Sequence, residues 1–415
     1  MSVHLDSSVV RDINTRKVLS AVRQKMSTRT ELARITHLSY PTVGTIIKAL
    51  AKDGFVVDEC LGEFGGGRKP MLVKFVPTAR YIIGVNLGGA EPQAVLSDLN
   101  GAFVSSIVKG NIEHLEEDTT GSVIRLIEDL RNVHPFSWDR IIGLGISVRG
   151  SFDIPNGHYY YPGRTTPLRL QDDLEERFGV PVILERNASA AALSEWVRRK
   201  PTGIRNILFI NVDKGVSSGL VVDGQLVRGF LGNAGEFGHV VVDRSGEFCP
   251  DCGQKGCLEN VASLGAIADE ARREGILFPE HDSVLDNYRD LVARARSGHD
   301  VALKCFARVT EVLGRATTSL VNVINPQLLV VGGRVIWHYP ELLDAISDFV
   351  VANCWPYSKQ GLEFALATED KHNFLHGAIA LILDRLFISI GDEFVADWNS
   401  HREFMGGRNR LASVE

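Results

Sequence analysis

The 415-residue sequence lacks the long apolar segments that membrane proteins and secreted precursors carry. A membrane-spanning helix needs about 18 or more apolar residues in a row, and the longest candidate, residues 378–390, is interrupted by Asp384 and Arg385. The first twelve residues contain no apolar core of the kind that a signal peptide needs. We therefore expect a cytoplasmic protein with no membrane partner.

Cysteine is also scarce, with six residues in the whole chain, which excludes a secreted scaffold held together by disulfides. Otherwise the composition is that of a globular protein, with 44% hydrophobic and 23% charged residues. This balance excludes a largely disordered or fibrous chain. At about 100 to 200 residues per domain, the length predicts two to four domains.

Charge divides the chain into two parts of opposite sign. Residues 1–80 contain 13 Lys and Arg against 7 Asp and Glu, a net charge of +6. The other 335 residues contain 32 against 44, a net charge of −12. A basic segment on an acidic body is expected when only that segment binds a polyanion. The alternative is a chance excess of charge on a solvated surface.

The beginning of the chain has the signals of consecutive short helices. Thr28 and Glu31 have the spacing of a capping box, in which each side chain satisfies a free backbone N–H of the other. Ser39 is a good N-cap for the next helix, and Gly54 is expected to end it. Together with the apolar spacing, these signals predict helices over 13–25, 30–36 and 40–53.

Two strands, over 55–57 and 71–75, are expected to flank a glycine-rich loop that carries Arg68 and Lys69. Two helices joined by a tight turn and followed by a basic hairpin are typical of a winged helix-turn-helix, in which the second helix enters a major groove. The alternative is a module for packing or dimerisation. The residues predicted to contact double-stranded operator DNA are Thr30, Ser39, Tyr40, Thr42, Thr45, Lys48, Arg68 and Lys69.

The rest of the sequence predicts two similar α/β halves. A strand and hairpin pattern over 81–108 recurs about 125 positions later over 206–227, with helices expected between them over 120–132 and 189–199. This repetition indicates duplicated lobes with a ligand-binding cleft between them, unless the two hairpins are alike by coincidence. Further buried strands are predicted over 141–148, 182–185 and 328–331.

One segment combines a histidine with three cysteines: His239, Cys249, Cys252 and Cys257. Three Cys and one His form a standard closed tetrahedral set for structural zinc. The alternatives are three reduced surface cysteines or a disulfide, which a reducing compartment disfavours. We interpret these residues as the ligands of a Zn²⁺ ion that stabilises a loop, since no coordination position would remain open for catalysis.

Residues 81–390 resemble the ROK family of repressors and sugar kinases. The motifs are Gly-Asn-Ala-Gly-Glu-Phe-Gly-His over 232–239, Cys-Gly-x-x-Gly-Cys-Leu-Glu over 252–259, Asn-Pro-x-Leu-Leu-Val-Val-Gly-Gly over 325–333 and the stretch 184–195. One departure concerns Cys249, because the family usually has one residue between the first two cysteines and this chain has two.

With its N-terminal helices the chain is similar to the repressor branch of N-acetylglucosamine and xylose repressors. The resemblance implies an α/β fold: a winged helix-turn-helix followed by a two-lobed, actin-like (ribonuclease H-like) ROK domain. The expected domains are 1–80, the DNA-binding head, 81–205, the first lobe, and 206–415, the second lobe with the zinc-binding segment 239–257 and C-terminal helices.

Other departures from the family argue against an enzyme. ROK kinases have an Asp as general base in a Glu-Asn-Asp-Ala-Asn run, and Asn187 stands in its place. An amide can position a hydroxyl but cannot take its proton, and losing the base lowers the rate about 10²- to 10⁴-fold. The kinase loop Asp-x-Gly-Gly-Thr-Lys reads Asn86-Leu-Gly-Gly-Ala-Glu91 here, so Glu91 would repel phosphate. We expect no catalytic residues.

The sugar contacts of the family are partly retained. The resemblance implies sugar binding by Asn187, Glu236, His239 and Glu259, with His239 serving zinc through one ring nitrogen and the sugar through the other. Arg149 stands where the family has Pro, and Arg186 and Ser189 replace two Asn. An Arg149 that points inward would indicate an acidic or phosphorylated ligand, and one that points outward would indicate nothing about the ligand.

These features favour a DNA-binding transcriptional regulator of carbohydrate genes, a repressor in preference to an activator. A sugar or sugar-phosphate effector would bind in a catalytically dead, kinase-like cleft and change the fit of a homodimer to its operator, with a tetramer as the alternative assembly. Two other hypotheses stay open: an active sugar kinase with a DNA-binding head, and a regulator whose effector is another protein.

Overall fold

The computed structural model describes residues 7–60, 71–89, 91–279, 283–367 and 372–387. These residues fall into two compact units. The first holds the chain up to Val148, then Arg169–Glu185, and the chain from Ala378 onwards. The second holds Arg149–Leu168 and Arg186–Gly377.

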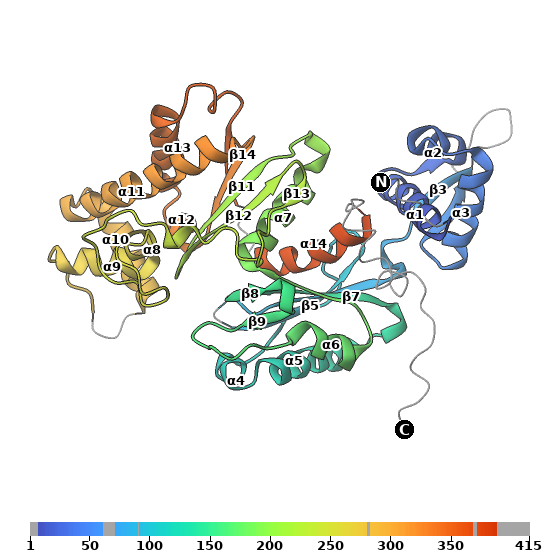
Figure 1. The fold of residues 1–415 in the computed structure, drawn as a ribbon, viewed down its shortest axis with the longest axis horizontal. Coiled ribbons are helices and arrows are strands. Elements are labelled where there is room, and N and C mark those ends of the chain that lie inside the picture. The colour runs from blue at the N-terminus through green and yellow to red at the C-terminus, as the bar shows by residue number, and fades with distance from the viewer. Residues whose placement is uncertain (1–6, 61–70, 90, 280–282, 368–371, 388–415) are drawn as a thin grey trace. The chain divides into compact units, whose positions relative to one another are not determined.

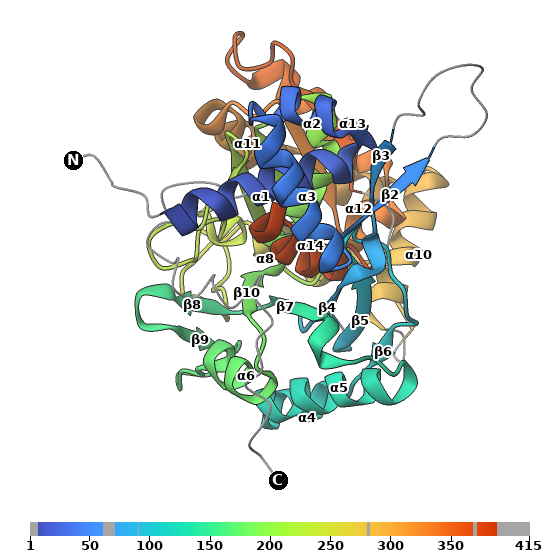
Figure 2. The same ribbon diagram turned by 90° about the vertical axis from the view of Figure 1, so that its right-hand side faces the viewer.

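The first 80 residues form three helices and a small antiparallel sheet with strand order β1-β3-β2 (Figure 2). Leu19, Leu32, Val43, Ile47 and Val73 fill the space between them and are at most 1% exposed. The elements are α1 (Ser7–Gln24), β1 (Ser27–Thr28), α2 (Arg29–Thr36), α3 (Tyr40–Lys52), β2 (Val56–Cys60) and β3 (Met71–Phe75).

The predicted caps of these helices are present. Thr28 and Glu31 form a complete capping box on α2, and the Ser39 hydroxyl accepts a hydrogen bond from the N–H of Thr42 at the start of α3. His37 ends α2 in the left-handed conformation. The strand β1 was not expected, because two residues are too few to show an alternating pattern.

The first α/β sheet has the strand order β10-β7-β4-β5-β6. Its central strand β4 runs antiparallel to β5 and parallel to β7. Helices α4, α5 and α6 lie together beneath these strands in Figure 2. The elements are β4 (Tyr81–Asn86), β5 (Gln93–Asp98), β6 (Val108–Lys109), α4 (Ile112–Glu117), α5 (Thr119–Val133), β7 (Ile141–Val148), α6 (Leu170–Phe178) and β10 (Val182–Arg186).

The second sheet repeats this topology with the order β15-β14-β11-β12-β13. Its central strand β11 again runs antiparallel to the next strand, β12, and parallel to a later one, β14. The predicted duplication of the two halves is therefore confirmed at the level of strand topology. The strands are β11 (Ile207–Val212), β12 (Val216–Val222), β13 (Gln225–Leu226), β14 (Leu328–Gly332) and β15 (Glu363–Leu366), and the hairpin of β8 (Ser151–Asp153) and β9 (His158–Tyr160) belongs to the same unit.

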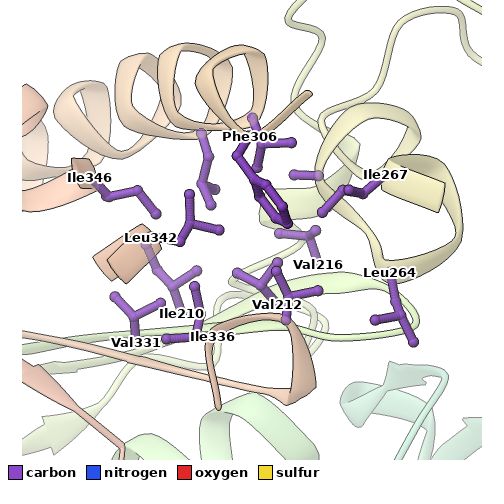
Figure 3. Packing of buried hydrophobic residues seen from close by; sticks show 14 of the residues in the cluster. Ile210, Val212, Val216, Leu264, Ile267, Phe306, Val331, Ile336, Leu342 and Ile346 are labelled. Atoms are coloured by element: carbon purple, nitrogen blue, oxygen red, sulfur yellow. The ribbon is translucent and has the colours of Figure 1, made fainter. Parts of the chain in front are cut away.

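Helices cover this second sheet and supply most of its core. Phe306 of α11 and Ile267 of α9 point toward Val216 and Val212 of the sheet, and Leu342 of α13 lies beside Ile210 and Val331 (Figure 3). Figure 1 shows the helices around the strands. The helices are α7 (Asn187–Arg199), α8 (Glu259–Ala262), α9 (Leu264–Arg273), α10 (Val284–Arg296), α11 (Asp300–Ile324), α12 (Arg334–His338), α13 (Glu341–Asn353) and α14 (Asn373–Phe387). Short 3₁₀ turns are η1 (Pro77–Ala79), η2 (Trp138–Arg140), η3 (Ile154–Asn156), η4 (Lys200–Thr202) and η5 (Phe237–His239).

The compact units have other bounds than the predicted division at residues 80 and 205. Helix α7 packs on β11 and β12, so it groups with the second sheet and not with the first. Helix α14 is shared: Gly377 contacts Ala190 of α7, whereas a side chain at Gly145 of β7 would overlap the carbonyl oxygen of Ala378. The predicted division followed the order of residues along the chain, whereas the observed units follow the packing contacts between elements.

The C-terminal end of α14 is capped by side chains of α1. The guanidinium of Arg16 donates a hydrogen bond to the carbonyl of Arg385 (2.8 Å), and the Ser20 hydroxyl donates to the carbonyl of Phe387 (2.8 Å). The Arg23 guanidinium lies over the ring of Phe387 at 4.5 Å. Cations are stabilising at this end of a helix because its last carbonyls are unsatisfied.

Over the described parts of the chain, none of the helices combines the length and the hydropathy that crossing a bilayer requires. This holds for helix α14, which contains residues 378–387 of the longest apolar candidate in the sequence.

Candidate functional site

The predicted metal ligands come together in the second unit. One ligand atom from each of His239, Cys249, Cys252 and Cys257 lies within 4.8 Å of the others. The Sγ of Cys249 is 3.7 Å from Nδ1 of His239, and the Sγ atoms of Cys252 and Cys257 are 3.4 Å apart. Cys249, which the extra residue in the motif had put in doubt, therefore belongs to the cluster.

Backbone turns bring these thiols together. The N–H of Cys249 donates to the carbonyl of Gln254 (2.7 Å), and the N–H of Gly253 donates to the carbonyl of Cys249 (2.9 Å). Gly256 has a φ of 74°, and a side chain there would overlap the carbonyl oxygen of Asp243. Glycine is thus required where the chain returns to Cys257.

The four donors suit a metal ion, because three thiols and an imidazole are a standard closed set for zinc. A hydrogen bond from the N–H of Gln254 lowers the pKa of the Cys252 thiol. Burial raises the pKa of Cys257 to about 12, and metals bind the thiolate form, so an ion would have to displace that proton. The cluster can hold a metal but offers no open position for a reacting molecule.

The second ring nitrogen of His239 lies near a carboxylate. Its Nε2 lies 4.0 Å from Oε2 of Glu236, while Nδ1 faces the thiol of Cys249. Glu236 also forms an ion pair with Arg186, whose Nη2 is 3.0 Å from Oε1. Thus Glu236 and His239, both predicted sugar ligands, lie side by side, and Arg186 occupies one carboxylate oxygen.

Glu259 is partly engaged by the backbone. Its Oε2 accepts a hydrogen bond from the N–H of Val216 (2.8 Å), and burial raises the pKa of its carboxyl group. A nearby His239 acts in the opposite direction on that pKa. The glutamate therefore lies next to the metal-binding segment, with one oxygen already bonded.

Asn187 is the first residue of α7, directly after the end of β10. Its Oδ1 is buried, and no hydrogen-bond partner for it occurs among the residues that the structure describes. A buried acceptor without a partner costs free energy unless a ligand or water donates to it. The amide is thus prepared to accept a hydrogen bond, although it cannot remove a proton.

Hydrogen bonds of Asn86 and an ion pair of Glu91 hold the glycine turn after β4. Oδ1 of Asn86 accepts from the N–H of Gly88 (2.9 Å) and from the hydroxyl of Ser147 (3.3 Å). Glu91 forms an ion pair with Lys109 (2.7 Å). At this turn Asn86 offers an amide in place of a carboxylate, and the carboxylate of Glu91 and the ammonium of Lys109 are paired with each other.

An ion pair that the sequence analysis missed occupies the corresponding point of the second sheet. Nε of Arg334 lies 2.9 and 3.0 Å from the two carboxylate oxygens of Asp213, and the N–H of Arg334 also donates to Asp213 (3.2 Å). The carboxyl ends of adjacent parallel strands, where connections diverge, are the usual ligand position in α/β sheets. Each residue directly follows, or nearly follows, a predicted buried strand, and this is the signal that could have found the pair.

The remaining departures from the family pattern have clear positions. The side chain of Arg149 is exposed. Its carbonyl accepts a hydrogen bond from the Tyr159 hydroxyl (2.6 Å). Ser189 is buried in α7, with 2% of its surface exposed.

Most of the predicted DNA contacts that lie in the described part of the first 80 residues are exposed. Thr30, Ser39, Tyr40, Thr45 and Lys48 are exposed, and Tyr40 is 57% exposed despite its ring. Their hydroxyls also serve the fold, since that of Ser39 caps α3 and that of Thr45 donates to the carbonyl of Pro41. Thr42 is half-buried. Arg68 and Lys69 lie outside the described residues.

Comparison with known proteins identifies a matching family and related proteins. Residues 82–385 match the ROK family. The chain is 27% identical over 385 residues to the xylose repressor of Bacillus spizizenii, covering 91% of this chain and 97% of that protein. It is 30% identical over 305 residues to the glucokinase of Halalkalibacterium halodurans, covering 70% of this chain and 91% of that one.

The fold of nearly the whole chain has a counterpart among solved structures. The crystal structure of a ROK family transcriptional regulator, a homologue of the Escherichia coli MLC protein, matches 91% of this chain and 97% of its own with a TM-score of 0.79 and 24% identity. A match over 91% of 415 residues must extend into the first 81 positions, because only 334 residues follow them. The likeness therefore includes part of the three-helix segment.

Proposed function

Because the chain belongs to the ROK family, we propose that it is a DNA-binding transcriptional repressor of carbohydrate genes that responds to a sugar or sugar-phosphate effector. The observation that carries this proposal is the likeness to a xylose repressor over 91% of this chain, which reaches beyond the ROK region into the basic first 80 residues. The glucokinase relative, by contrast, aligns with 70% of the chain.

In this proposal residues 1–80 are a winged helix-turn-helix head, and residues 81–205 and 206–415 are the two ROK lobes. Helix α3 would enter the major groove with Tyr40, Thr42, Thr45 and Lys48, assisted by Thr30, Ser39, Arg68 and Lys69. A homodimer would place two heads on a two-fold symmetric operator, and a tetramer is the alternative assembly. The exposure of Tyr40, Thr45 and Lys48 on α3 supports this assignment.

The effector would bind at Asn187, Glu236, His239 and Glu259. Support comes from the unpartnered Oδ1 of Asn187 and from the neighbouring positions of Glu236 and His239. Carboxylate and amide oxygens accept hydrogen bonds from sugar hydroxyls. Helix α14 contacts α7 near its beginning and is capped by α1 at its end, and we propose that it carries the effector signal to the head.

We also propose that the chain is not an enzyme and that its cofactor is one structural Zn²⁺ held by His239, Cys249, Cys252 and Cys257. The amides of Asn187 and Asn86, and the pairing of Asp213 with Arg334, support the absence of catalysis. Zinc would tie the segment 239–257 to the effector residues, as the contact of His239 with Glu236 suggests.

A gel-shift measurement on the DNA upstream of the protein's own gene tests the regulator proposal. The purified chain should retard that DNA but not a scrambled duplex of equal length, and one member of a panel of sugars, polyols and sugar phosphates should release it. Retardation of both duplexes alike, or of neither, would contradict specific operator binding.

An active kinase with a DNA-binding head is the second candidate, and the 30% identity to a glucokinase favours it. A coupled assay of ATP consumption over the same sugar panel separates the two proposals. We expect no sugar-dependent turnover above the background of the assay, with the glucokinase as positive control. Steady turnover on any sugar would establish the kinase instead.

A further inference from the structure

Resting on the proposed function, we propose that Arg186 is a positioning residue that holds Glu236 against His239 and thereby links effector binding to metal binding. The three side chains form an unbroken series of contacts from the junction of β10 and α7 to the cysteine cluster. Arg186, which replaces an Asn of the family pattern, is not among the residues predicted from the sequence to bind the sugar or the metal.

Arg186 is held in a defined place. It is the last residue of β10 and precedes α7, and only 7% of its side chain is exposed. Nη1 donates to the carbonyl of Ala234 (2.7 Å), and Nη2 lies 3.0 Å from Oε1 of Glu236. The planar guanidinium therefore binds the loop 234–236 at two points, the carbonyl of Ala234 and the carboxylate of Glu236. A flexible ammonium or a neutral amide could not do this equally well.

Glu236 lies between two potential cations. Oε1 faces Arg186, and Oε2 lies 4.0 Å from Nε2 of His239, whose Nδ1 is 3.7 Å from the thiol of Cys249. A metal-binding histidine commonly gives its second ring nitrogen to a carboxylate that is itself held by hydrogen bonds, and losing such a partner weakens metal binding about 10- to 100-fold. Glu236 has this place, and Arg186 is what holds Glu236.

Burial makes the arrangement persistent. A buried guanidinium is stable only when paired, so Arg186 retains its carboxylate partner. Glu236, with 39% of its side chain exposed, would otherwise be free to turn toward solvent. An effector hydroxyl that donates to Glu236 would compete with Arg186 at Oε1 or with His239 at Oε2. Effector and metal should therefore change each other's affinity by the same factor.

The test measures the zinc dissociation constant of the full-length chain by competition with a chromophoric chelator. We expect Arg186→Gln to raise it about tenfold and Glu236→Gln to do the same or more. The double variant should be no weaker than Glu236→Gln alone, because Arg186 acts through Glu236. Arg186→Lys keeps the charge and should recover part of the loss.

The matched control is Arg199→Gln, which removes an arginine from another buried carboxylate, Glu195, on the same helix α7. It should leave the zinc dissociation constant unchanged, and circular dichroism should show that all variants are folded. If Arg186→Gln does not fold, the comparison of Arg186→Lys with wild type takes its place.

Zinc affinity of Arg186→Gln within twofold of wild type would overturn the inference, and so would losses that add in the double variant or a wild-type chain that binds no zinc. The gel shift on upstream DNA is recorded with the same samples. A chain that binds zinc in the expected pattern but no operator would refute the proposed function while leaving the role of Arg186 intact.

Discussion

Asn187 replaces the residue that ROK kinases use as general base, and this single position raises the question of whether the chain could be reactivated. We expect Asn187→Asp to show no sugar-dependent ATP consumption. A restored base supplies at most about 10⁴-fold in rate, while Asn86 would remain an amide bonded within its own turn and Asp213 would remain paired with Arg334. The coupled assay checks this, and turnover above the wild-type background would contradict it.

Cys257 is the most deeply buried of the four proposed zinc ligands, with no exposed surface. We expect Cys257→Ser to lose the metal and to unfold at lower temperature. With free zinc a thousandfold above its dissociation constant, loss of binding removes about 4 kcal/mol from the free energy of unfolding. Calorimetry and metal analysis measure the two effects, with Cys354→Ser, a buried cysteine outside the cluster, as the control.

A Cys257→Ser chain that kept one zinc per chain and full operator affinity would show that the ion, if present, is held elsewhere. Reversibility gives a second check: zinc added after chelation should restore the melting temperature of the wild type but not that of the variant.

At the scale of single residues, the metal ligands were predictable because they are close in sequence, and a short turn brings them together. The ion pairs were not. Arg186 is 50 positions from Glu236, and Asp213 is 121 positions from Arg334, so only the packing of strands and loops reveals these partners. The unpartnered oxygen of Asn187 is likewise a property of its surroundings and not of its sequence.

Among the elements, α2 shows how a local signal sets both a helix start and a pH response. The backbone N–H and the hydroxyl of Thr28 hold the pKa of Glu31 below its ordinary value of 4.5. A group whose folded pKa is depressed stabilises the fold at neutral pH, and this contribution is lost as pH falls below the ordinary value toward the folded one. Acid should therefore loosen α2.

We expect Thr28→Ala to cost the helix about 1 kcal/mol and to reduce this acid sensitivity in part, because the hydroxyl is lost but the backbone N–H of residue 28 can still bond Glu31. Hydrogen exchange of peptides covering residues 29–36, corrected for the intrinsic pH dependence of exchange, measures both effects. Thr45→Ala, whose hydroxyl only donates within α3, serves as the control. Equal protection of α2 in wild type and Thr28→Ala at neutral pH would show that the capping box contributes nothing.

The contact between α1 and α14 supplies another prediction at this scale. Burial lowers the pKa of Arg16 to about 10, so the side chain stays charged at neutral pH. We expect Arg16→Met to reduce the stability of the first three helices by about 2 kcal/mol, because the carbonyl of Arg385 loses its donor. Operator binding should then respond less to the effector.

Hydrogen exchange of the peptides of α1 to α3 and the gel shift with the releasing sugar are the two measurements. Arg11→Met, an exposed position on the same helix, is the control. If Arg16→Met behaves like Arg11→Met in both, α14 does not carry the effector signal.

The elements themselves were largely predictable, for physical reasons that differ between them. Strand β7 has the bounds expected of its unbroken apolar run, Ile141–Val148, and α3 follows from its cap and its apolar stripe. Helix α1 begins at Ser7, six residues before the predicted start; Val10 and Arg11 in this extension are exposed, so no buried apolar stripe marks it. The shared position of α14 depends on contacts distant in sequence, and no local pattern predicts it.

For the whole molecule, the opposite charges of the head and the rest of the chain should control DNA affinity. Binding of cationic side chains to phosphates releases counterions, so affinity falls with salt in proportion to the number of contacts. We expect Lys48→Ala to weaken binding to all sequences alike and to reduce the slope of log affinity against log salt by about one per head. Titrations at several salt concentrations measure this slope.

The control for Lys48 is Lys109→Ala, a lysine outside the head that pairs with Glu91. It should leave the slope unchanged. A change of sequence preference without a change of slope would instead mean that Lys48 reads a base and not a phosphate.

Helix α14 has a practical consequence for anyone who exchanges heads among relatives of this protein. A chimera joined only near residue 80 would pair a foreign α1 with the native end of α14, and the foreign side chains would have to satisfy the carbonyls of Arg385 and Phe387. A successful graft must therefore transplant both ends of the polypeptide together, or retain Arg16 and Ser20 in the incoming helix.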